Sequence, residues 1–254
     1  MVMSTSIRAC GNDECTTTFQ PQVHNQAYCS QRCKRDMENV RRQTVTEEPL
    51  YDEQTWQAQE TKKLLRAEEN KAKNAWILEN KSFATFDLET SNLNASIGEI
   101  LCGCVKNVGG NTKTFVAGRQ GDGTVADRIR EELMKYDYII TWYGTGFDLP
   151  FLQTRLLLSG NPPLSHIRHV DLYYTARSQL AMHSNRQQAV GETLLGESNK
   201  TRLIGSVWNA AMKGNRTAMK YIVDHCQKDV EELERIFGYL VRFRNLAATP
   251  LRIY

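Results

Sequence analysis

Two acidic residues end a short apolar segment and are spaced so that both could bind one metal ion. Asp87 and Glu89 lie two residues apart in the segment Phe83–Thr90. Residues two apart on a β-strand point to the same side of a sheet, so the two carboxylates share one face. Two carboxylates together at the end of a strand form a site for a hard divalent cation. A D-x-E pattern alone is usually surface charge, and the apolar strand before it makes this one informative.

Two further aspartates lie in predicted helices. Asp148 follows a glycine-containing turn and precedes the predicted helix 149–159. An aspartate at that place commonly caps the helix, and a capping carboxylate still has an oxygen for a metal ion or its water. Asp229 lies beside the apolar stripe of the predicted helix 218–243, and His225 lies four residues earlier on the same face. Taken alone, that pair is typical of a His–Asp contact at the margin of a core.

The N-terminal segment contains four of the seven cysteines, in two pairs spaced C-x4-C and C-x3-C. The four residues are Cys10, Cys15, Cys29 and Cys33. Two closely spaced pairs let two tight turns present four thiolates to one tetrahedral Zn²⁺. A structural zinc would stabilise a segment too small for a sufficient apolar core. His24 is an alternative ligand, although it belongs to neither pair.

Nucleic-acid binding by this cysteine segment stays open on the sequence. The basic residues Arg32, Lys34 and Arg35 favour a phosphate contact. Four thiolates around one zinc carry a net negative charge, and Asp36 is interleaved with the basic residues, which opposes that contact.

The composition is that of a globular protein with a packed core. Of the 254 residues, 41% are hydrophobic and 24% are charged, which excludes a disordered chain. No apolar run reaches the about 20 residues of a membrane-spanning helix, and the first ten residues lack the apolar part of a secretory signal. Residues 81–254 contain 21 Lys and Arg against 17 Asp and Glu, which permits a polyanionic partner.

The order of predicted elements indicates an α/β fold with a mixed sheet. Strands are predicted at 82–88, 97–108, 112–116, 138–143 and 167–170, and helices at 127–135, 149–159, 172–182 and 218–243. Three consecutive strands followed by strands that alternate with helices are typical of that class. Residues 183–215 are broken by four glycines, at 191, 196, 205 and 214. The predicted organisation is a zinc-ribbon-like module at 1–42, a helical linker at 43–80 and the α/β domain at 81–254.

The four acids in this order resemble the DEDD family of 3′→5′ exonucleases, which have a ribonuclease H-like fold. The resemblance runs from Phe83 to Phe243 and includes Phe-Asp-x-Glu-Thr, Gly-x-x-Phe-Asp-x-Pro-Phe-Leu and His-Cys-x-x-Asp-Val. The nearest resemblance is to the ribonuclease H-like exonuclease group predicted in bacteria and phages. It implies a cytoplasmic location, in a bacterium or a phage-infected cell, where free cysteines stay reduced. The segment Tyr28–Lys34 resembles the second knuckle of many zinc ribbons.

The resemblance implies two Mg²⁺ or Mn²⁺ ions and a role for each acidic residue. By analogy, Asp87 bridges both ions, and Glu89 and Asp229 complete the ion that binds the attacking water. Asp148 holds the second ion, and His225 orients or deprotonates the water. The family has either Tyr four residues before the last Asp or His five residues before it. Here a histidine occupies the tyrosine position, so its role is less firmly implied than the roles of the acids.

The implied substrate is the 3′ end of a single-stranded nucleic acid, with DNA favoured over RNA and no membrane partner. No residue pattern decides between the two sugars or identifies a protein partner. Residues near the motifs could stack on terminal bases or contact phosphates, and a packing or solvated role explains each equally well. They are Leu88, Thr90, Phe147 and Phe151 for bases, and Arg155, Lys200 and Arg202 for phosphates. The pair His169 and Asp171 is interpreted as structural.

Two alternatives remain beside the exonuclease. A non-catalytic nucleic-acid-binding or regulatory protein could use the same fold, and the unusual position of His225 is the sequence feature that favours it. Acids at all four positions argue against it, because a degenerate site usually loses some. A structure-specific endonuclease with the same metal ions is also compatible with the sequence.

Overall fold

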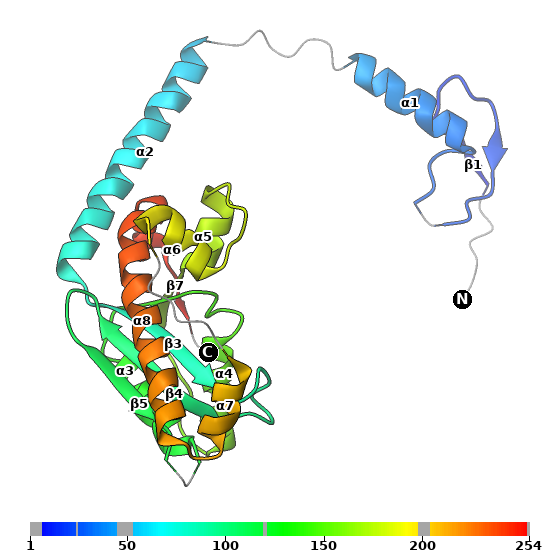
Figure 1. The fold of residues 1–254 in the computed structure, drawn as a ribbon. Coiled ribbons are helices and arrows are strands. Elements are labelled where there is room, and N and C mark those ends of the chain that lie inside the picture. The colour runs from blue at the N-terminus through cyan, green and yellow to red at the C-terminus, as the bar shows by residue number, and fades with distance from the viewer. Residues whose placement is uncertain (1–6, 24, 45–52, 119–120, 198–203, 253–254) are drawn as a thin grey trace. The chain divides into compact units, whose positions relative to one another are not determined.

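A computed structural model describes residues 7–23, 25–44, 53–118, 121–197 and 204–252 of the chain (Figure 1). The chain divides into two compact units, Met1–Arg66 and Ala67–Tyr254, and the point of division lies within the helix α2 (Glu53–Asn80). The three-part organisation expected from the sequence stays a prediction, because residues 45–52 lie outside the described part of the chain.

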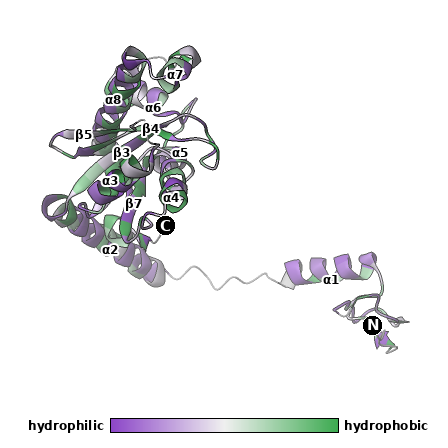
Figure 2. Ribbon diagram, turned by 90° about the horizontal axis from the view of Figure 1, so that it is seen from below, coloured by the Kyte–Doolittle hydropathy of each residue, from purple (hydrophilic) through white to green (hydrophobic). Residues whose placement is uncertain are grey.

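The first unit contains little apolar packing. Strand β1 (Arg8–Ala9) pairs antiparallel with β2 (Thr18–Phe19), and helix α1 (Gln31–Thr44) follows. Of the side chains described between residues 7 and 42, only Cys10 and Asn12 are buried. Figure 2 shows α1 as an almost wholly hydrophilic helix. The order of this unit therefore cannot come from a hydrophobic core.

The C-terminal end of α2 belongs to the second unit and packs on it. Ile77 is the one described residue of α2 that is buried, and it lies in an apolar cluster of the second unit. The Asn74 side chain accepts a hydrogen bond from the Leu246 N–H at 2.9 Å. The remainder of α2 is solvated, as its Gln-, Glu- and Lys-rich sequence predicts.

A six-stranded mixed sheet forms the centre of the second unit, in the order β5-β4-β3-β6-β7-β8. The strands are β3 (Phe83–Thr90), β4 (Ile100–Asn107), β5 (Thr112–Val116), β6 (Tyr138–Thr141), β7 (Ile167–Asp171) and β8 (Leu251–Arg252). β3, β4 and β5 form an antiparallel meander, β6 and β7 run parallel to β3, and β8 is antiparallel to β7. The mixed sheet expected from the sequence is confirmed, and the strand β8 was not expected.

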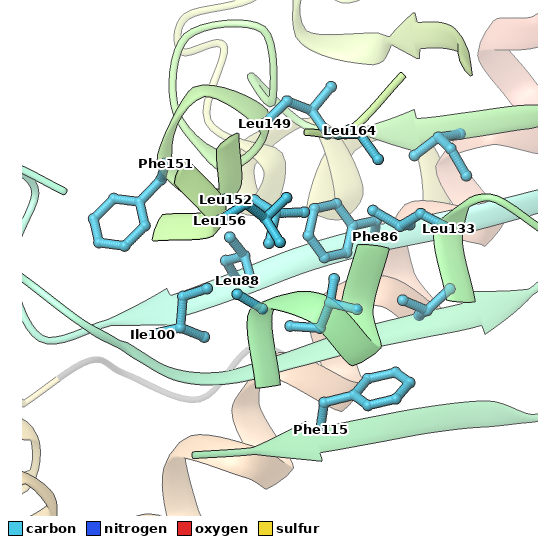
Figure 3. Close-up of a cluster of buried hydrophobic side chains, with 14 of the residues drawn as sticks. Phe86, Leu88, Ile100, Phe115, Leu133, Leu149, Phe151, Leu152, Leu156 and Leu164 are labelled. Carbon is cyan, nitrogen blue, oxygen red and sulfur yellow. The ribbon is translucent and has the colours of Figure 1, made fainter. Parts of the chain in front are cut away.

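One face of the sheet is covered by α3 (Gly123–Leu133) and α4 (Asp148–Leu158). Ala84, Phe86 and Leu88 point into this face and are almost fully buried, as the alternation along β3 predicts. Figure 3 shows Phe86 and Leu88 among the leucines of α3 and α4. The other side chains of β3 must therefore point to the opposite face.

The opposite face is covered by α8 (Arg216–Leu240), together with α5 (Leu172–Gln179), α6 (Gln187–Leu195) and α7 (Gly205–Met212). α8 begins where the Asn215 side chain accepts a hydrogen bond from the Ala218 N–H at 3.0 Å. Its predicted apolar stripe is buried, from Ile222 to Phe237. The acidic positions of β3 are thus on the face that packs against α8.

Residues 183–215, which the sequence predicts to be broken by glycines, contain the helices α6 and α7. The four glycines lie mainly at helix ends. Gly196 caps α6 with a φ of 77°, and Gly214 follows α7 with a φ of 84°, both in the left-handed region that glycine tolerates. Gly205 is the first residue of α7. Within the described residues, no helix is both long and apolar enough to span a bilayer.

Candidate metal sites and active site

The four N-terminal cysteines converge on one point. The Sγ atoms of Cys15 and Cys29 are 3.6 Å apart, and those of Cys29 and Cys33 are also 3.6 Å apart. The Cys29 N–H donates to the Cys10 Sγ at 3.4 Å, and all four sulfur atoms lie within 4.8 Å of one another. Four thiolates about 2.3 Å from a tetrahedral zinc are about 3.8 Å apart. The sulfur positions therefore fit one zinc ion.

The thiols of this cluster differ in pKa when no metal is bound. A hydrogen bond from the Thr17 side chain is the main cause that lowers the pKa of Cys15 to about 6. Desolvation raises the pKa of Cys29 to about 12. One thiolate thus forms easily, and its close neighbour keeps a proton. A divalent cation would reverse that preference and favour the thiolate form of every ligand.

The two acids of β3 lie beside α8, which is held against β3 by hydrogen bonds. The Thr85 hydroxyl donates to the Val230 carbonyl at 2.8 Å. The Cys226 thiol donates to the Asp87 carbonyl at 3.5 Å. These contacts bring the middle of α8 to the end of β3 that contains Asp87 and Glu89.

Glu89, His225 and Asp229 come together from the two elements. The His225 Nε2 atom is 3.7 Å from a Glu89 carboxylate oxygen and 3.6 Å from an Asp229 carboxylate oxygen. One ligand atom from each residue lies within 4.8 Å of the other two. The i, i+4 spacing on α8 explains why His225 and Asp229 share a face. The two carboxylates at this separation can bind a divalent cation, and the imidazole lies within reach of a water on that cation.

Gln187, which no sequence motif indicated, and Trp208, which follows the Leu-Leu-Gly stretch of the family resemblance, contact the backbone and ring of this cluster. The Gln187 side-chain amide donates to the Asp229 carbonyl at 2.8 Å. The Trp208 ring stands edge-on to the His225 ring, with 6.2 Å between the centroids. His225 is only 3% exposed, so its ring is held in a packed position.

Asp148 does not cap its own helix, contrary to the simpler interpretation of the sequence. Phe147 is the N-cap residue, and Asp148 is the first residue of α4. Its Oδ1 atom accepts a hydrogen bond from the Leu88 N–H at 3.0 Å. Leu88 lies between Asp87 and Glu89, so this bond places the Asp148 carboxylate next to the acidic end of β3.

Burial raises the pKa of Asp148 to about 7, and the negative charges of Asp171 and Asp229 act in the same direction. The hydrogen bond from Leu88 opposes the increase without cancelling it. A carboxylate in this environment gains stability when a cation binds close by. The hydrogen bond from the Leu88 N–H therefore holds Asp148 beside the acidic end of β3.

The turn before Asp148 is held by Asp171, at the end of β7. One oxygen of its carboxylate accepts from the Tyr143 N–H at 2.9 Å, and the other accepts from the Thr145 N–H at 2.9 Å. Asp171 also caps α5 by accepting from the Tyr173 N–H at 3.1 Å. His169, with its pKa lowered by burial to about 4, pairs with the Thr141 hydroxyl at 2.7 Å. Both residues form hydrogen bonds that position the turn that begins α4.

Tyr143 has a φ of 64°, which is unusual for a residue with a large side chain. Such a conformation costs on the order of 1–3 kcal/mol and persists where surrounding contacts over-determine it. Gly144 and Gly146 flank this position, and a side chain at Gly146 would collide with the Tyr143 ring. The local sequence Tyr-Gly-Thr-Gly is therefore matched to one turn shape.

The suggested phosphate and base contacts have different environments. Arg155 forms two hydrogen bonds to the carboxylate of Asp122, at 2.7 and 2.8 Å, and Asp122 is 2% exposed. This buried pair assigns Arg155 to the structure of the fold. Leu88 and Phe151 belong to the core, and Thr90 is buried. Lys200, Arg202 and His24 lie outside the described residues.

A hollow of about 440 Å³ adjoins the N-terminus of α4. Its lining includes Gly146, Phe147 and Pro150 from the start of the helix, and Leu93 and Ala95 from the segment after β3. Phe147 directly precedes Asp148 in the chain, and none of the four acidic residues lines this hollow.

Comparisons with known proteins agree with this fold. The model of a family described as RNase_H superfamily matches residues 84–241. A family B DNA polymerase from the hyperthermophilic archaeon Pyrobaculum calidifontis is similar in structure, with a TM-score of 0.52 and 17% identity. The match covers 67% of this chain and 27% of the polymerase chain. A search of curated proteins finds no match.

These findings confirm the ribonuclease H-like fold that the sequence resemblance implied. The family match includes α4, α8 and all of β3 except Phe83, and therefore Asp87, Glu89, Asp148 and Asp229. The cysteine cluster lies outside the matched residues. Because the family model matches more than half of its length, the chain belongs to the RNase H superfamily.

Proposed function

We propose that the protein is a metal-dependent 3′→5′ exonuclease acting on single-stranded nucleic acid, with DNA preferred over RNA. The observation that carries the proposal is the convergence of Glu89, His225 and Asp229 within 4.8 Å. Membership of the RNase H superfamily supports a nuclease in general, and the likeness to a DNA polymerase supports the same fold class.

The acidic residues of the site suit two divalent ions. When bound, such ions supply an activated water and stabilise the leaving 3′-oxygen in phosphodiester cleavage. Asp87 would bridge the two ions, Glu89 and Asp229 would complete one of them, and Asp148 would hold the other. All of these ligands are carboxylate oxygens, which Mg²⁺ and Mn²⁺ prefer.

His225 is proposed to orient or deprotonate the attacking water. Its Nε2 atom lies between the Glu89 and Asp229 carboxylates, at 3.7 and 3.6 Å. Imidazole is a common general base, and this position places the ring between the two carboxylates proposed to hold the ion that binds the water. Replacing His225 with alanine should lower the cleavage rate about 100-fold and leave Mn²⁺ affinity nearly unchanged. Unchanged cleavage would make His225 a packing residue.

The cysteine cluster is proposed to hold one structural zinc, with Cys10, Cys15, Cys29 and Cys33 as ligands. The 3.6 Å sulfur separations support this assignment. The zinc would organise a unit that has almost no buried side chains.

The main test compares wild-type protein with Asp229→Asn and Asp224→Asn on 5′-labelled single-stranded DNA and RNA of one sequence. Reactions contain Mg²⁺, Mn²⁺ or EDTA. Asp224 is a matched control, because it lies on the same helix, is solvent-exposed and pairs with Lys220. We expect products that shorten from the 3′ end by single nucleotides, lost with Asp229→Asn and in EDTA but retained with Asp224→Asn.

A circular single-stranded DNA and a 3′-blocked oligonucleotide distinguish the alternatives. Cleavage of the circle would assign an endonuclease instead. No cleavage of any substrate, together with retained binding, would favour a non-catalytic nucleic-acid-binding protein.

A further inference from the structure

A cluster of aromatic side chains lies next to the turn that leads into Asp148. We define the tyrosine cluster as Tyr143, from the turn between β6 and α4, and Tyr173 and Tyr174, from α5. The Tyr143 ring centroid is 4.9 Å from that of Tyr173 and 6.2 Å from that of Tyr174. Tyr173 also meets Trp142 edge-on, at 6.4 Å. Two separate elements therefore present their aromatic rings at one place.

Two rings of the tyrosine cluster are open to solvent. Tyr143 is 44% exposed and Tyr174 is 42% exposed, whereas Tyr173 is partly buried beneath them. The Trp142 indole N–H donates to the Asn185 carbonyl at 3.2 Å, which fixes the base of the cluster. The cluster is thus anchored on one side and presents ring surface on the other.

The fold holds Tyr143 in place although its backbone conformation is unfavourable. Its φ of 64° lies in the left-handed region, where asparagine or glycine would be easier to accommodate. The buried Asp171 carboxylate accepts hydrogen bonds from the N–H groups of Tyr143 and Thr145. Gly146 has no side chain at the point where the Tyr143 ring lies. A strained residue kept by several contacts beside an active site points to a role for its side chain.

The tyrosine cluster is connected to the acidic site through a few bonds. The Tyr143 carbonyl accepts hydrogen bonds from the Gly146 N–H at 2.9 Å and from the Phe147 N–H at 3.1 Å. Gly146 and Phe147 line the hollow of about 440 Å³, and Phe147 directly precedes Asp148 in the chain. The Tyr143 ring lies against Gly146, which is one of the residues that line the hollow.

Two exposed arginines follow the tyrosines of α5 in the sequence. Residues 172–191 contain two arginines, a histidine and no Asp or Glu. Arg177 is one helical turn after Tyr174 on α5, and Arg186 follows Asn185 at the base of the cluster. Both arginines are exposed. Positive charge beside exposed rings complements a chain of phosphates and bases, and a neutral apolar ligand would not need it.

We propose that the tyrosine cluster is a stacking subsite for the bases of a single-stranded nucleic acid whose 3′ end enters the acidic site. The proposal rests on the proposed exonuclease function and adds the residues that hold the chain behind its reacting end. Stacking on aromatic rings is tolerant of sequence, because every base has a π face. A paired base in a duplex cannot offer that face, so the subsite selects for single strands.

The test measures binding separately from cleavage. A fluorescent single-stranded DNA of about 12 nucleotides is titrated with the full-length protein in Ca²⁺ and in EDTA, where no cleavage is expected. The variants are Tyr143→Asn, Tyr143→Phe and Tyr174→Ala, with Tyr239→Ala as control. Asparagine tolerates the left-handed backbone and removes the ring, and phenylalanine keeps the ring. Tyr239 is similarly exposed, at 45%, but lies ten residues beyond Asp229 on α8.

We expect Tyr143→Asn and Tyr174→Ala to weaken DNA binding about 10-fold each, as expected for loss of stacking on one base. Tyr143→Phe and Tyr239→Ala should bind as the wild type does. Equal binding by wild type and Tyr143→Asn, with the variant folded by circular dichroism, would overturn the proposal. If Tyr143→Asn does not fold, the comparison of Tyr174→Ala with Tyr239→Ala decides in the same way.

A second arm identifies the stacked base. Oligonucleotides with one abasic site, moved stepwise from the 3′ end, are bound to wild type and to Tyr143→Asn. One abasic position should weaken wild-type binding and leave the variant unaffected, since the ring and base are removed from the same contact. No such position would contradict base stacking. Because neither arm requires turnover, a protein that binds through the cluster but never cleaves would refute only the exonuclease assignment.

Discussion

The cysteine unit (Met1–Arg66) and the sheet unit (Ala67–Tyr254) differ in what their clustered ligands contribute to the fold. In the first, only Cys10 and Asn12 are buried among the side chains described up to residue 42. In the second, three apolar clusters surround the sheet. A metal at the cysteines would therefore create the fold around it, and metals at the carboxylates would enter a fold that already exists.

The sheet unit fixes its acidic residues with groups that are not themselves ligands. The Thr85 hydroxyl binds the Val230 carbonyl, and the Gln187 amide binds the Asp229 carbonyl. The site geometry thus depends on neutral hydrogen bonds and apolar packing. Comparing the two units shows that clustered ligands can be the cause of a local structure or its result.

The strongest test of this comparison removes zinc from the full chain. A chelator, or Cys29→Ser with Cys33→Ser, should unfold residues 7–44 and leave the sheet unit folded. Structural zinc contributes about 10–16 kcal/mol in small modules, more than such a unit can replace. Hydrogen exchange resolved by segment, with metal analysis that finds about one zinc per chain, provides the measurement. Protection of 7–44 that survives chelation would contradict the comparison.

A second test asks whether the sheet unit depends on its own buried ion pair. Arg155→Met leaves the Asp122 carboxylate buried and unpaired, which should cost about 3–5 kcal/mol in urea unfolding. Arg128→Met is the control, because Arg128 is an exposed arginine on α3. DNA affinity should not change. If affinity falls while stability is retained, Arg155 contacts phosphate after all.

A third test uses the pH dependence of the metal-free protein. The pKa of Asp148 rises from 3.8 to about 7 on folding, so the folded state keeps a proton that the unfolded state releases. Stability should then fall as pH rises through this interval and level off above it. Asp148→Asn keeps the acceptor for the Leu88 N–H and should stabilise the protein at alkaline pH by on the order of 2–4 kcal/mol.

The measurement for Asp148 is thermal or urea unfolding of both proteins across the interval, without metal. Added Mn²⁺ should reduce the difference, because a cation stabilises the ionised carboxylate. Parallel stability curves for wild type and Asp148→Asn would show that this carboxylate is not the group responsible.

The smallest predicted effect concerns the strained turn. Tyr143→Asn relieves the backbone strain of a tyrosine in the left-handed region but removes its ring contacts. The strain and the ring contacts each contribute about 1 kcal/mol to the free energy of unfolding, with opposite signs. The net change in unfolding free energy should stay within about 0.5 kcal/mol. Tyr173→Asn, at a helical position with no strain to relieve, should cost more than that. A large loss for Tyr143→Asn would mean that the ring serves stability and not binding.

The strands and the acidic positions could be predicted because both follow a period-two pattern along β3. Ala84 and Phe86 alternate with Thr85 and Asp87, so one face had to be apolar and the other had to hold the acids. The helix α8 could be predicted equally well, because its apolar residues recur at helical spacing.

Other features depend on contacts between residues far apart in the chain. Gly191 lies inside α6 because a side chain there would meet Glu232 of α8, whereas the sequence shows only a helix-breaking residue. Arg155 is paired with Asp122, 33 residues earlier, and charge alone does not reveal that partner. Asp148 accepts a hydrogen bond from the Leu88 N–H, 60 residues away. Its position before a predicted helix does not reveal that it joins the start of α4 to β3.

The neutral bonds that hold α8 to β3 and to α6 also have an evolutionary consequence. Because Thr85 and Gln187 bind backbone carbonyls, a lineage could lose Asp87, Glu89 or Asp229 without losing the contacts that fix the helix. Mutation could then remove catalysis in one step and spare both the fold and the tyrosine cluster. A duplicated gene would encode, from its first inactivating substitution, a folded protein with its aromatic surface intact and open to selection for a new purpose.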